Sequence, residues 1–473
     1  MHVVMFGDQH AESLGGAQVS MRLQRRFLEK AGHTVTIVAP AMRGRRARAL
    51  APDASYVDLP SIPVTADREY SMTWPGRRTD RWLDAAMAAR GRVDVVHIQA
   101  DFWGAFIGYR FARRHGIPVV HTMHNRLDVG IEATTPFPKL VLRVLGAWQR
   151  RALGRSPEAP QERGHDGWAY QRRFAARAAA VTAPSTHFAR RLEEHGVRPG
   201  AAPADREPGV DVIWNGIDDD VLAEVLASAA ASASASASPS ASASASASDS
   251  ADANGAPADA PATDAKNLAD DATRRGVASV GGVSSSPARS ADQERRPRFV
   301  WLGRMSPEKR LLPFLEALAA SGVEADAEVI GGGGQLRAAR RLVDKLRPQA
   351  KVHFAGRMPY TQTLRRIAAA DAVVQTSIGF ETQGMTIFEA ASLGTPSIVS
   401  DPDLGAELGS GYWAVGDGVT PDPAIAALAA ALRDAASDIS AGTPRVPDPT
   451  IRERFRQSSR TAAMVEVYER VTA

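Results

Sequence analysis

The sequence predicts an α/β protein of two doubly wound, Rossmann-like domains, and three observations lead to this fold class. Short apolar runs alternate with segments of helical length, which is the pattern of parallel β-α-β units. The alternation occurs twice, in residues 1–214 and again in residues 297–450. A chain of 473 residues is also longer than one hydrophobic core usually serves, so at least two domains are expected.

The first domain begins with a β-α-β unit. A strand is predicted at residues 2–8, followed by a glycine-containing loop, an amphipathic helix at residues 19–32 and a second strand at residues 33–40. The same rhythm continues to the end of this domain, so we predict a parallel sheet. Its further segments are strands at residues 93–99, 117–124, 179–185 and 210–216, and a helix at residues 102–116.

A low-complexity segment then separates the two domains. Ala and Ser alternate at residues 229–248, and an Asp/Ala/Pro-rich run follows to about residue 296. These side chains bury too little apolar area to offset the entropy of ordering the chain. We therefore predict a disordered insert at residues 226–296 that carries no chemistry.

The second domain repeats the β-α rhythm after the insert. The last segment, residues 451–473, has helical spacing, and we expect it to pack back against the N-terminal domain. The predicted strands of the second domain lie at residues 298–304, 327–335, 351–357, 371–377 and 395–401.

Charge is unevenly distributed in a chain whose net charge is only +4. Residues 1–200 hold 30 Lys and Arg against 18 Asp and Glu, whereas the remainder holds 27 against 35. Two explanations stay open: the N-terminal half faces an anionic membrane surface or an acidic acceptor, or its composition is simply rich in arginine. We expect no nucleic-acid partner.

Composition also excludes several classes of protein. The absence of cysteine excludes disulfides, a thiolate nucleophile and cysteine metal sites. No segment approaches the roughly 20 apolar residues that cross a bilayer, and the first residues lack the pattern of a signal peptide. We therefore predict a cytoplasmic protein, with the inner face of the membrane as the alternative location.

Loops after the strands of the second domain are where such folds bind ligands. Arg304 and Lys309 follow the first strand and would neutralise a diphosphate, although each could be an ordinary surface cation. Gly333 lies in a run of four glycines that would let a phosphate or ribose approach the backbone, or would simply form a tight turn. Arg357 ends a third loop, which would face a nucleobase or form a packing turn.

The fourth loop carries two carboxylates at informative spacing. Glu381 would lie at the strand end within reach of sugar hydroxyls, and Glu389, eight residues on, would accept hydrogen bonds from a ribose diol. Between them Gly384, Met385 and Thr386 would offer N–H groups at the positive end of a helix, which suits a phosphate.

Together these segments resemble glycosyltransferase family 4, the glycosyl transferases of group 1, over nearly the whole chain apart from the insert. GRMSPEKR is similar to the family's Gly-Arg, Pro-Glu-Lys segment, and FETQGMTIFEA to its Glu-x7-Glu segment. GGAQ, HTMHN and NGID resemble its N-terminal loop, acceptor-side His and hinge. The resemblance implies a GT-B fold, in which two domains face a cleft, and retaining transfer from a nucleotide sugar without a metal or other cofactor.

The resemblance also implies roles for individual residues. Arg304 and Lys309 would hold the diphosphate of a UDP- or GDP-sugar, while a diphosphate oxygen takes the acceptor proton. Glu381 would hold the donor sugar and Glu389 the ribose. His124 would lie near the reacting sugar.

Two glycines of the first loop complete the implied site. Gly15 and Gly16 would let the backbone meet donor and acceptor. The family's aromatic-Gly pair after the first Glu is replaced by Thr382-Gln383-Gly384, which puts the identity of the donor in doubt. Acidic triplets at residues 218–220 and 401–403 fit the metal motif of other sugar transferases, but we discount both and expect no metal site.

The acceptor is a hydroxyl compound, for which we consider a lipid or a cell-envelope glycan. Residues 139–153 mix apolar and cationic positions as a membrane-surface helix would. In the alternative, Leu140, Val144, Leu145 and Trp148 pack into the domain, as helical stripes usually do.

Other functions with this architecture stay open. A nucleotide-sugar epimerase of the same fold would bind the donor but need no acceptor, and a catalytically silent module would bind the donor without turning it over. An NAD-dependent oxidoreductase would require a clean G-x-G-x-x-G after a strand with an acidic residue about 20 positions on, which neither half provides.

Overall fold

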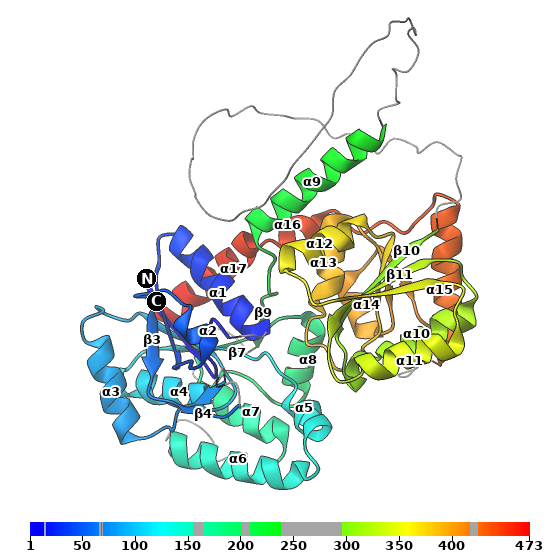
Figure 1. Cartoon of the computed structure of the whole chain (residues 1–473). Helices are drawn as coiled ribbons and strands as arrows, with labels where there is room; N and C mark the ends of the chain where they lie inside the picture. Colours follow the sequence, from blue (N-terminus) through cyan, green and yellow to red (C-terminus); the bar gives the residue numbers. More distant parts are fainter. Residues whose placement is uncertain are drawn as a thin grey trace, which may run out of the picture. The chain divides into compact units, whose positions relative to one another are not determined.

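The computed structural model describes residues 1–13, 16–65, 68, 70–154, 164–200, 209–237, 296–416 and 424–473. Residues 1–231 and 296–473 form one compact unit. This unit contains two parallel sheets with helices on both faces of each, so the predicted fold class is confirmed (Figure 1). None of the described helices is long and apolar enough to span a membrane.

Alternate residues of each central strand enter different hydrophobic cores, because successive side chains of a strand point to opposite faces. In β1 (His2–Gly7), Val4 and Phe6 belong to one core, whereas Val3 and Met5 belong to the other. All of these side chains are fully buried. A strand covered on both faces needs apolar residues at every position, which explains the continuous apolar runs of the sequence.

The N-terminal sheet has seven parallel strands in the order β3-β2-β1-β6-β7-β8-β9. Its members are β1, β2 (Thr34–Pro40), β3 (Tyr56–Leu59), β6 (Val95–Gln99), β7 (Val119–Thr122), β8 (Ala180–Ala183) and β9 (Val210–Val212). A separate antiparallel pair consists of β4 (Ile62–Pro63) and β5 (Ser71–Met72). The helices are α1 (Gly16–Lys30), α2 (Arg45–Arg48), α3 (Arg77–Met87), α4 (Trp103–His115), α5 (Leu127–Thr134), α6 (Pro138–Leu153), α7 (Gly167–Ala175) and α8 (Thr186–Glu194).

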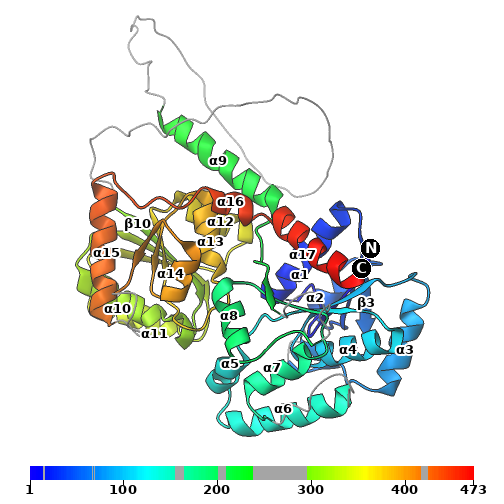
Figure 2. The same cartoon turned by 180° about the vertical axis from the view of Figure 1, so that it is seen from behind.

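The last helix of the chain, α17 (Gln457–Thr472), belongs to this N-terminal domain. It packs beside α1 (Figure 2). Met464, Val467 and Tyr468 join Val3 and Met5 in one core, and all three are almost completely buried. The core on this face of the N-terminal sheet is therefore built from both ends of the chain.

The second sheet has six parallel strands in the order β12-β11-β10-β13-β14-β15. They are β10 (Arg298–Arg304), β11 (Asp326–Gly332), β12 (Lys351–Gly356), β13 (Ala372–Gln375), β14 (Ser397–Val399) and β15 (Tyr412–Ala414). The helical segments are η1 (Pro307–Lys309), α10 (Leu311–Ser321), α11 (Leu336–Leu346), α12 (Tyr360–Ala369), α13 (Met385–Leu393), α14 (Pro402–Leu408), α15 (Ile425–Ser440) and α16 (Thr450–Arg454).

The structure differs from the sequence prediction at the start of the low-complexity segment. Helix α9 covers Asp219–Ala237, so residues 226–237, which we assigned to a disordered insert, are helical. Ala has the highest helix propensity, and acidic residues in the first turn favour the helix dipole, so this stretch can extend a helix. The rest of the insert, residues 238–295, lies outside the described residues.

Two glycines allow α4 to lie close to the central strand β1. A Cβ atom on Gly104 would overlap the backbone carbonyl of Gly7, and one on Gly108 would press on Phe6 at 2.8 Å. Neither glycine has a positive φ angle, so space rather than backbone strain requires them. This close approach also brings the N-terminus of α4 to Asp8, which accepts hydrogen bonds from the backbone N–H groups of Phe102 and Gly104.

We predict that Gly104→Ala lowers the free energy of unfolding by about 1–3 kcal/mol, because the new methyl group must displace backbone. Gly130→Ala is the matched control, since a Cβ atom on this helical glycine meets nothing within 4 Å. The control should be neutral or slightly stabilising. Urea unfolding followed by tryptophan fluorescence measures both, and equal midpoints for the two variants would contradict the packing argument.

Candidate functional site

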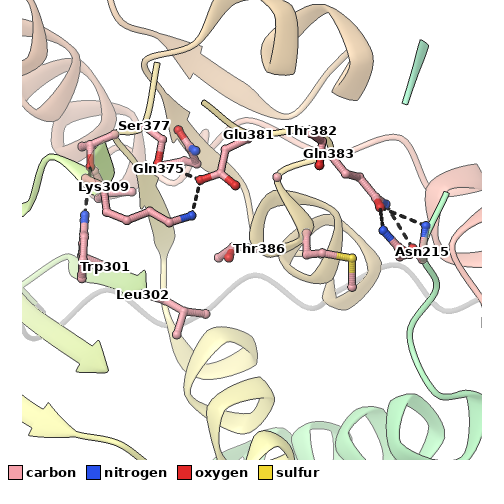
Figure 3. Close-up of a pocket in the computed structure, with 14 residues that line it drawn as sticks. Asn215, Trp301, Leu302, Lys309, Gln375, Ser377, Glu381, Thr382, Gln383 and Thr386 are labelled. Carbon is pink, nitrogen blue, oxygen red and sulfur yellow. Dashed lines mark hydrogen bonds and ion pairs between the residues drawn. The ribbon is translucent and has the colours of Figure 1, made fainter. Parts of the chain in front are cut away.

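A cavity of about 260 Å³ lies in the second domain where β10 and β13 end and α13 begins (Figure 3). Five of the residues predicted from the sequence line it. They are Lys309, Glu381, Gly384, Met385 and Thr386. Residues to which the sequence assigned no binding role complete the wall: Asn215, Trp301, Leu302, Val374, Gln375, Thr376, Ser377, Thr382 and Gln383.

Lys309 and Glu381 form an ion pair inside this cavity (Figure 3). Lys309 Nζ donates to Glu381 Oε1, and Ser377 Oγ donates to the same oxygen at 2.8 Å. About a fifth of each charged side chain is exposed, so the pair is screened by solvent only in part. Both charges are therefore held at the edge of the sheet within reach of a ligand.

Buried side chains fix the position of Lys309. Thr376 Oγ1 donates to the backbone carbonyl of Lys309 at 2.7 Å, and Trp301 Nε1 donates to Thr376 Oγ1 at 2.9 Å. Trp301 lies on β10, and Thr376 directly follows the adjacent strand β13. Both residues are buried. The short helix η1 is thus tied to the sheet.

Helix α13 begins at the cavity with its positive end. Its N-cap is Gly384, which has a φ of 72° and no side-chain capping hydrogen bond. A Cβ atom at this position would lie 2.9 Å from Leu404, so both conformation and space favour glycine. Met385 and Thr386 form the first turn and line the cavity. An uncapped helix N-terminus of this kind suits an anionic oxygen.

Glu389 lies one turn further into α13 and outside the cavity lining. Glu389 is only 5% exposed, and burial raises the pKa of its carboxyl. The hydroxyl of Tyr360, the first residue of α12, donates to Glu389 Oε1 at 2.7 Å. Glu389, which we predicted to bind the ribose, thus accepts a hydrogen bond from a hydroxyl of the protein itself.

Arg304, Gly333 and Arg357 lie at or just beyond the ends of β10, β11 and β12, which neighbour each other in the sheet. Arg304 is exposed, and the side chain of Arg357 approaches the backbone of Gly332. Gly333 has a φ of 155°, and a Cβ atom there would lie 2.6 Å from the Met305 carbonyl. The turn therefore needs this glycine. None of the three residues lines the cavity.

In the N-terminal domain, His124 follows β7 and is half-buried. Its Nε2 lies 3.3 Å from Gln99 Oε1, and burial lowers the pKa of its imidazole to about 4. Its backbone carbonyl accepts a hydrogen bond of 3.0 Å from Thr382 Oγ1, beside Glu381. Gly16 is the first residue of α1 and has open space around it, whereas Gly15 lies outside the described residues.

Gln383 and Asn215 form a contact that sequence reasoning missed. Gln383 Oε1 accepts hydrogen bonds from the backbone N–H and the side-chain amide of Asn215, and Gln383 Nε2 donates to the Asn215 carbonyl at 3.0 Å. Ser20 of α1 donates to Asn215 Oδ1 at 2.8 Å. The only available signal was the departure of Thr382-Gln383 from the family pattern, which did not reveal the partner 168 residues away.

Glu407 of α14 binds the N-terminus of α8. Its carboxylate accepts hydrogen bonds from the backbone N–H of Thr186 at 3.0 Å and from Trp214 Nε1 at 2.9 Å. Burial acts to raise the pKa of Glu407, but contacts with His187, Thr186 and Trp214 outweigh it and lower the pKa to about 2. A helix N-terminus from one domain is thus satisfied by a carboxylate from the other.

The acidic triplets have structural partners in this structure. Asp218 pairs with Arg26, and Asp220 pairs with Lys30 at 3.0 Å. Asp401 caps α14 through the N–H groups of Asp403 and Leu404. Among the described residues, no cluster of three His, Asp or Glu side chains has the arrangement of a metal site.

Two family models match the chain, one in each half. The model "Glycosyltransferase Family 4" matches residues 14–221, and the model "Glycosyl transferases group 1" matches residues 284–440. Alpha-monoglucosyldiacylglycerol synthase of Streptococcus pneumoniae is 27% identical over 128 residues. That alignment spans 27% of this chain and 27% of the synthase.

Solved structures share the fold over the full length. Sucrose-phosphate synthase from Thermosynechococcus elongatus has a TM-score of 0.60 with 15% identity, covering 99% of this chain and 98% of that chain. Anabaena HepE, crystallised with UDP and glucose, has a TM-score of 0.57 with 14% identity, covering 99% of each chain. At such identities the likeness establishes the two-domain architecture alone.

We predict that Glu407→Gln lowers the free energy of unfolding at pH 7 by about 2–3 kcal/mol. A carboxylate whose pKa is lowered in the folded state stabilises the fold at every pH above the ordinary glutamate pKa of 4.5. That contribution is lost as the pH falls from about 4.5 towards 2, so the wild type should lose stability more steeply than Glu407→Gln in this window. Urea midpoints across pH measure this. The control is Glu194→Gln at the exposed end of α8, which should change little, and parallel pH profiles for wild type and Glu407→Gln would refute the assignment.

Proposed function

The chain belongs to glycosyltransferase family 4, and from that premise we propose that it transfers a sugar from a nucleoside-diphosphate sugar to a hydroxyl acceptor with retention of the anomeric configuration. The observation that carries the proposal is the Lys309–Glu381 pair in a cavity at the uncapped N-terminus of α13. A cation, a carboxylate and helix N–H groups meet there, which suits a diphosphate next to sugar hydroxyls.

Binding of the donor would replace the internal ion pair. A diphosphate oxygen is a stronger partner for Lys309 than a single carboxylate, because it carries more negative charge. Glu381, released from Lys309 but still bonded to Ser377, would then accept hydrogen bonds from the hydroxyls of the sugar. Arg304 and Arg357 at the neighbouring strand ends would add positive charge around the nucleotide. UDP is the nucleotide we favour, since Anabaena HepE of the same fold was crystallised with UDP and with UDP-glucose.

The chemistry needs no metal ion in this proposal. The bond between the anomeric carbon and the diphosphate oxygen breaks, and a bond from that carbon to the acceptor oxygen forms on the same face. Lys309 and the N–H groups of α13 stabilise the negative charge that develops on the leaving diphosphate. A diphosphate oxygen takes the acceptor proton, so no protein base is required. His124 would contact the reacting sugar from the N-terminal domain.

We further propose a lipid acceptor reached from an anionic membrane surface. Phe137, Leu140 and Val144, at the start of α6 and along it, are 68%, 61% and 59% exposed, which corrects the expectation that Leu140 and Val144 pack into the core. Leu145 and Trp148 of the same helix do pack against the core. The apolar residues of α6 therefore reach both its outer and its inner face, with Trp148 between the two.

The exposed face of α6 is also basic. The helix contains no acidic residue, and four cations accompany the apolar side chains: Lys139, Arg143, Arg150 and Arg151. Trp74, which is 63% exposed, stacks on Trp148 at 5.1 Å between ring centroids and widens the apolar surface. Exposed apolar and basic side chains on one helix favour the headgroup region of an anionic bilayer. The partial likeness to a synthase of a glucosylated diacylglycerol supports the same class of acceptor.

The test of the function is the release of nucleoside diphosphate from UDP-, GDP- and ADP-sugars in EDTA, with and without a lipid extract. We expect Lys309→Ala to lower turnover by at least about 100-fold, because a preorganised charge at the leaving group is lost. Arg304→Ala should cost less, roughly 10-fold, since Arg304 is exposed and does not line the cavity. Lys345→Ala on α11 is the control and should keep full activity. Near-normal rates in Lys309→Ala would remove the diphosphate assignment. Release without any acceptor would favour a hydrolase, and conversion of the donor into another nucleotide sugar without release would favour an epimerase.

The membrane proposal is tested by flotation with vesicles of phosphatidylcholine, with and without phosphatidylglycerol. Leu140→Asp should weaken binding to the anionic vesicles on the order of 10-fold or more, because a buried leucine contributes about 1.5–3 kcal/mol. Leu346→Asp is the matched control, since Leu346 is an exposed leucine on α11 of the second domain. Equal binding of the two variants, or no binding by the wild type, would exclude this surface.

A further inference from the structure

Gln375 is a buried glutamine whose side-chain amide has no hydrogen-bond partner within the described part of the chain. It is the last residue of β13, is 7% exposed and lines the cavity (Figure 3). Its Oε1 is buried and unpaired. Few buried polar groups of folded proteins stay unpaired, because each loses its hydration without gaining a hydrogen bond. An unpaired amide in the wall of a binding cavity therefore indicates a partner outside the protein.

The strand directs the Gln375 side chain toward α13. Successive side chains of a strand alternate between the two faces of the sheet. Val373 and Val374 belong to different cores, and Val373 shares its core with Phe388 of α13. Gln375 therefore lies on the same face as Val373. There it lines the cavity together with Thr386, in the first turn of α13.

Most other polar side chains of the cavity wall are bonded within the protein. The bonded pairs are Asn215 with Gln383, Lys309 and Ser377 with Glu381, Thr376 with Trp301, and Thr382 with the His124 carbonyl. Gln375 and Thr386 are the two polar side chains of this wall that make no hydrogen bond within the described residues. The Gln375 amide is therefore a buried polar group that the protein leaves for a ligand.

The chemistry of the amide favours a hydroxyl group as that ligand. An amide has a donor end and an acceptor end, and a hydroxyl both donates and accepts, whereas a diphosphate oxygen only accepts. The diphosphate already has Lys309 and the positive end of α13 as partners in the proposed reaction. Glu381, the proposed ligand of sugar hydroxyls, is bonded to Ser377, two residues beyond Gln375. A neutral amide at this strand end suits the sugar better than the diphosphate.

We propose that Gln375 is a specificity-determining residue that hydrogen-bonds a hydroxyl of the donor sugar. The proposal rests on the transfer reaction proposed above and adds a residue that selects the sugar. A site whose buried polar group needs a substrate hydroxyl rejects analogues without it, because that group then stays unpaired. Gln375 therefore discriminates among sugars that differ at the bonded hydroxyl.

The first test is the stability of the protein without ligand. Gln375→Met keeps the length of the side chain and removes the amide, so we expect the urea midpoint to stay the same or to rise. Gln149→Met is the matched control. Gln149 is completely buried, donates to the Tyr170 carbonyl at 2.9 Å and accepts from Arg173 Nε at 2.5 Å. The control should lower the midpoint, because it leaves both partners unpaired. A lowered midpoint in Gln375→Met would mean that the amide has a partner within the protein, and would overturn the proposal.

Calorimetric titration in EDTA then separates the sugar from the nucleotide. The probes are UDP and whichever of UDP-glucose, UDP-galactose and UDP-N-acetylglucosamine the wild type binds most tightly. Gln375→Met should weaken binding of that UDP-sugar about 10-fold and binding of UDP less than about 2-fold, since one hydrogen bond to the sugar is lost. An unchanged affinity for the UDP-sugar, or an equal loss for UDP, would sink the inference and leave the proposed function standing. If the wild type binds no UDP- or GDP-sugar, the proposed function fails and this inference fails with it.

Deoxy analogues of the donor identify the bonded hydroxyl. Each analogue lacks one hydroxyl of the sugar and is titrated into the wild type and into Gln375→Met. For the analogue without the bonded hydroxyl, the two proteins should agree within about 2-fold, because the interaction is absent from both. The other analogues should keep the full difference between the two proteins. A difference that persists in every analogue would mean that Gln375 does not bond a sugar hydroxyl.

Discussion

The ion pair of Lys309 and Glu381 is the interaction around which the rest of the site is arranged. The two residues are 72 positions apart, and they meet only because β10 and β13 are adjacent parallel strands whose carboxyl ends share one edge. Two opposite charges in a cavity are stable there because each has further partners, Ser377 for the carboxylate and the Thr376-tethered backbone for the lysine. The site is thereby held in place by contacts within the protein itself.

The parts of this site that the sequence predicted share one property, which is that their geometry is local. Lys309 follows a strand by a few residues, and Gly384, Met385 and Thr386 are consecutive, so strand ends and helix starts place them without knowledge of the tertiary contacts. The hydrogen bonds between Gln383 and Asn215 depend on how two segments distant in sequence lie together in the fold. The periodicity of the sequence does not predict such a contact. The hydroxyl of Tyr360 on Glu389 was missed for the same reason. Strand β15 was missed because three residues are too few for a periodic pattern.

Helix α6 shows how a correct pattern can still leave two structures open. Its apolar residues form two stripes, and hydrophobic spacing alone does not say which stripe faces the domain. Leu145 and Trp148 pack beneath the helix, where Trp148 meets Phe106 edge to face at 5.2 Å. Leu140 and Val144 point outward. At about 100° per residue, Leu145 is turned roughly 100° away from Val144, whereas Trp148 is only about 40° from Val144 and lies at the boundary between the outer and inner faces. The extent of the Ala/Ser helix was open in a similar way, because alternation favours a strand while alanine favours a helix.

The two segments that pass between the domains are bonded to each other, which connects the site with the C-terminal helix. Ile217 exchanges backbone hydrogen bonds with the second segment, donating to the Phe455 carbonyl at 2.9 Å and accepting from Gln457 at 2.8 Å. A Cβ atom on Gly216 would lie 2.7 Å from Gln457, so glycine is what permits this approach. Asn215, next to this contact, holds Gln383 at the cavity, and α17 begins at Gln457 and carries Tyr468 into the N-terminal core. One hydrogen-bonded junction therefore holds both the segment that contacts the cavity loop and the start of the C-terminal helix.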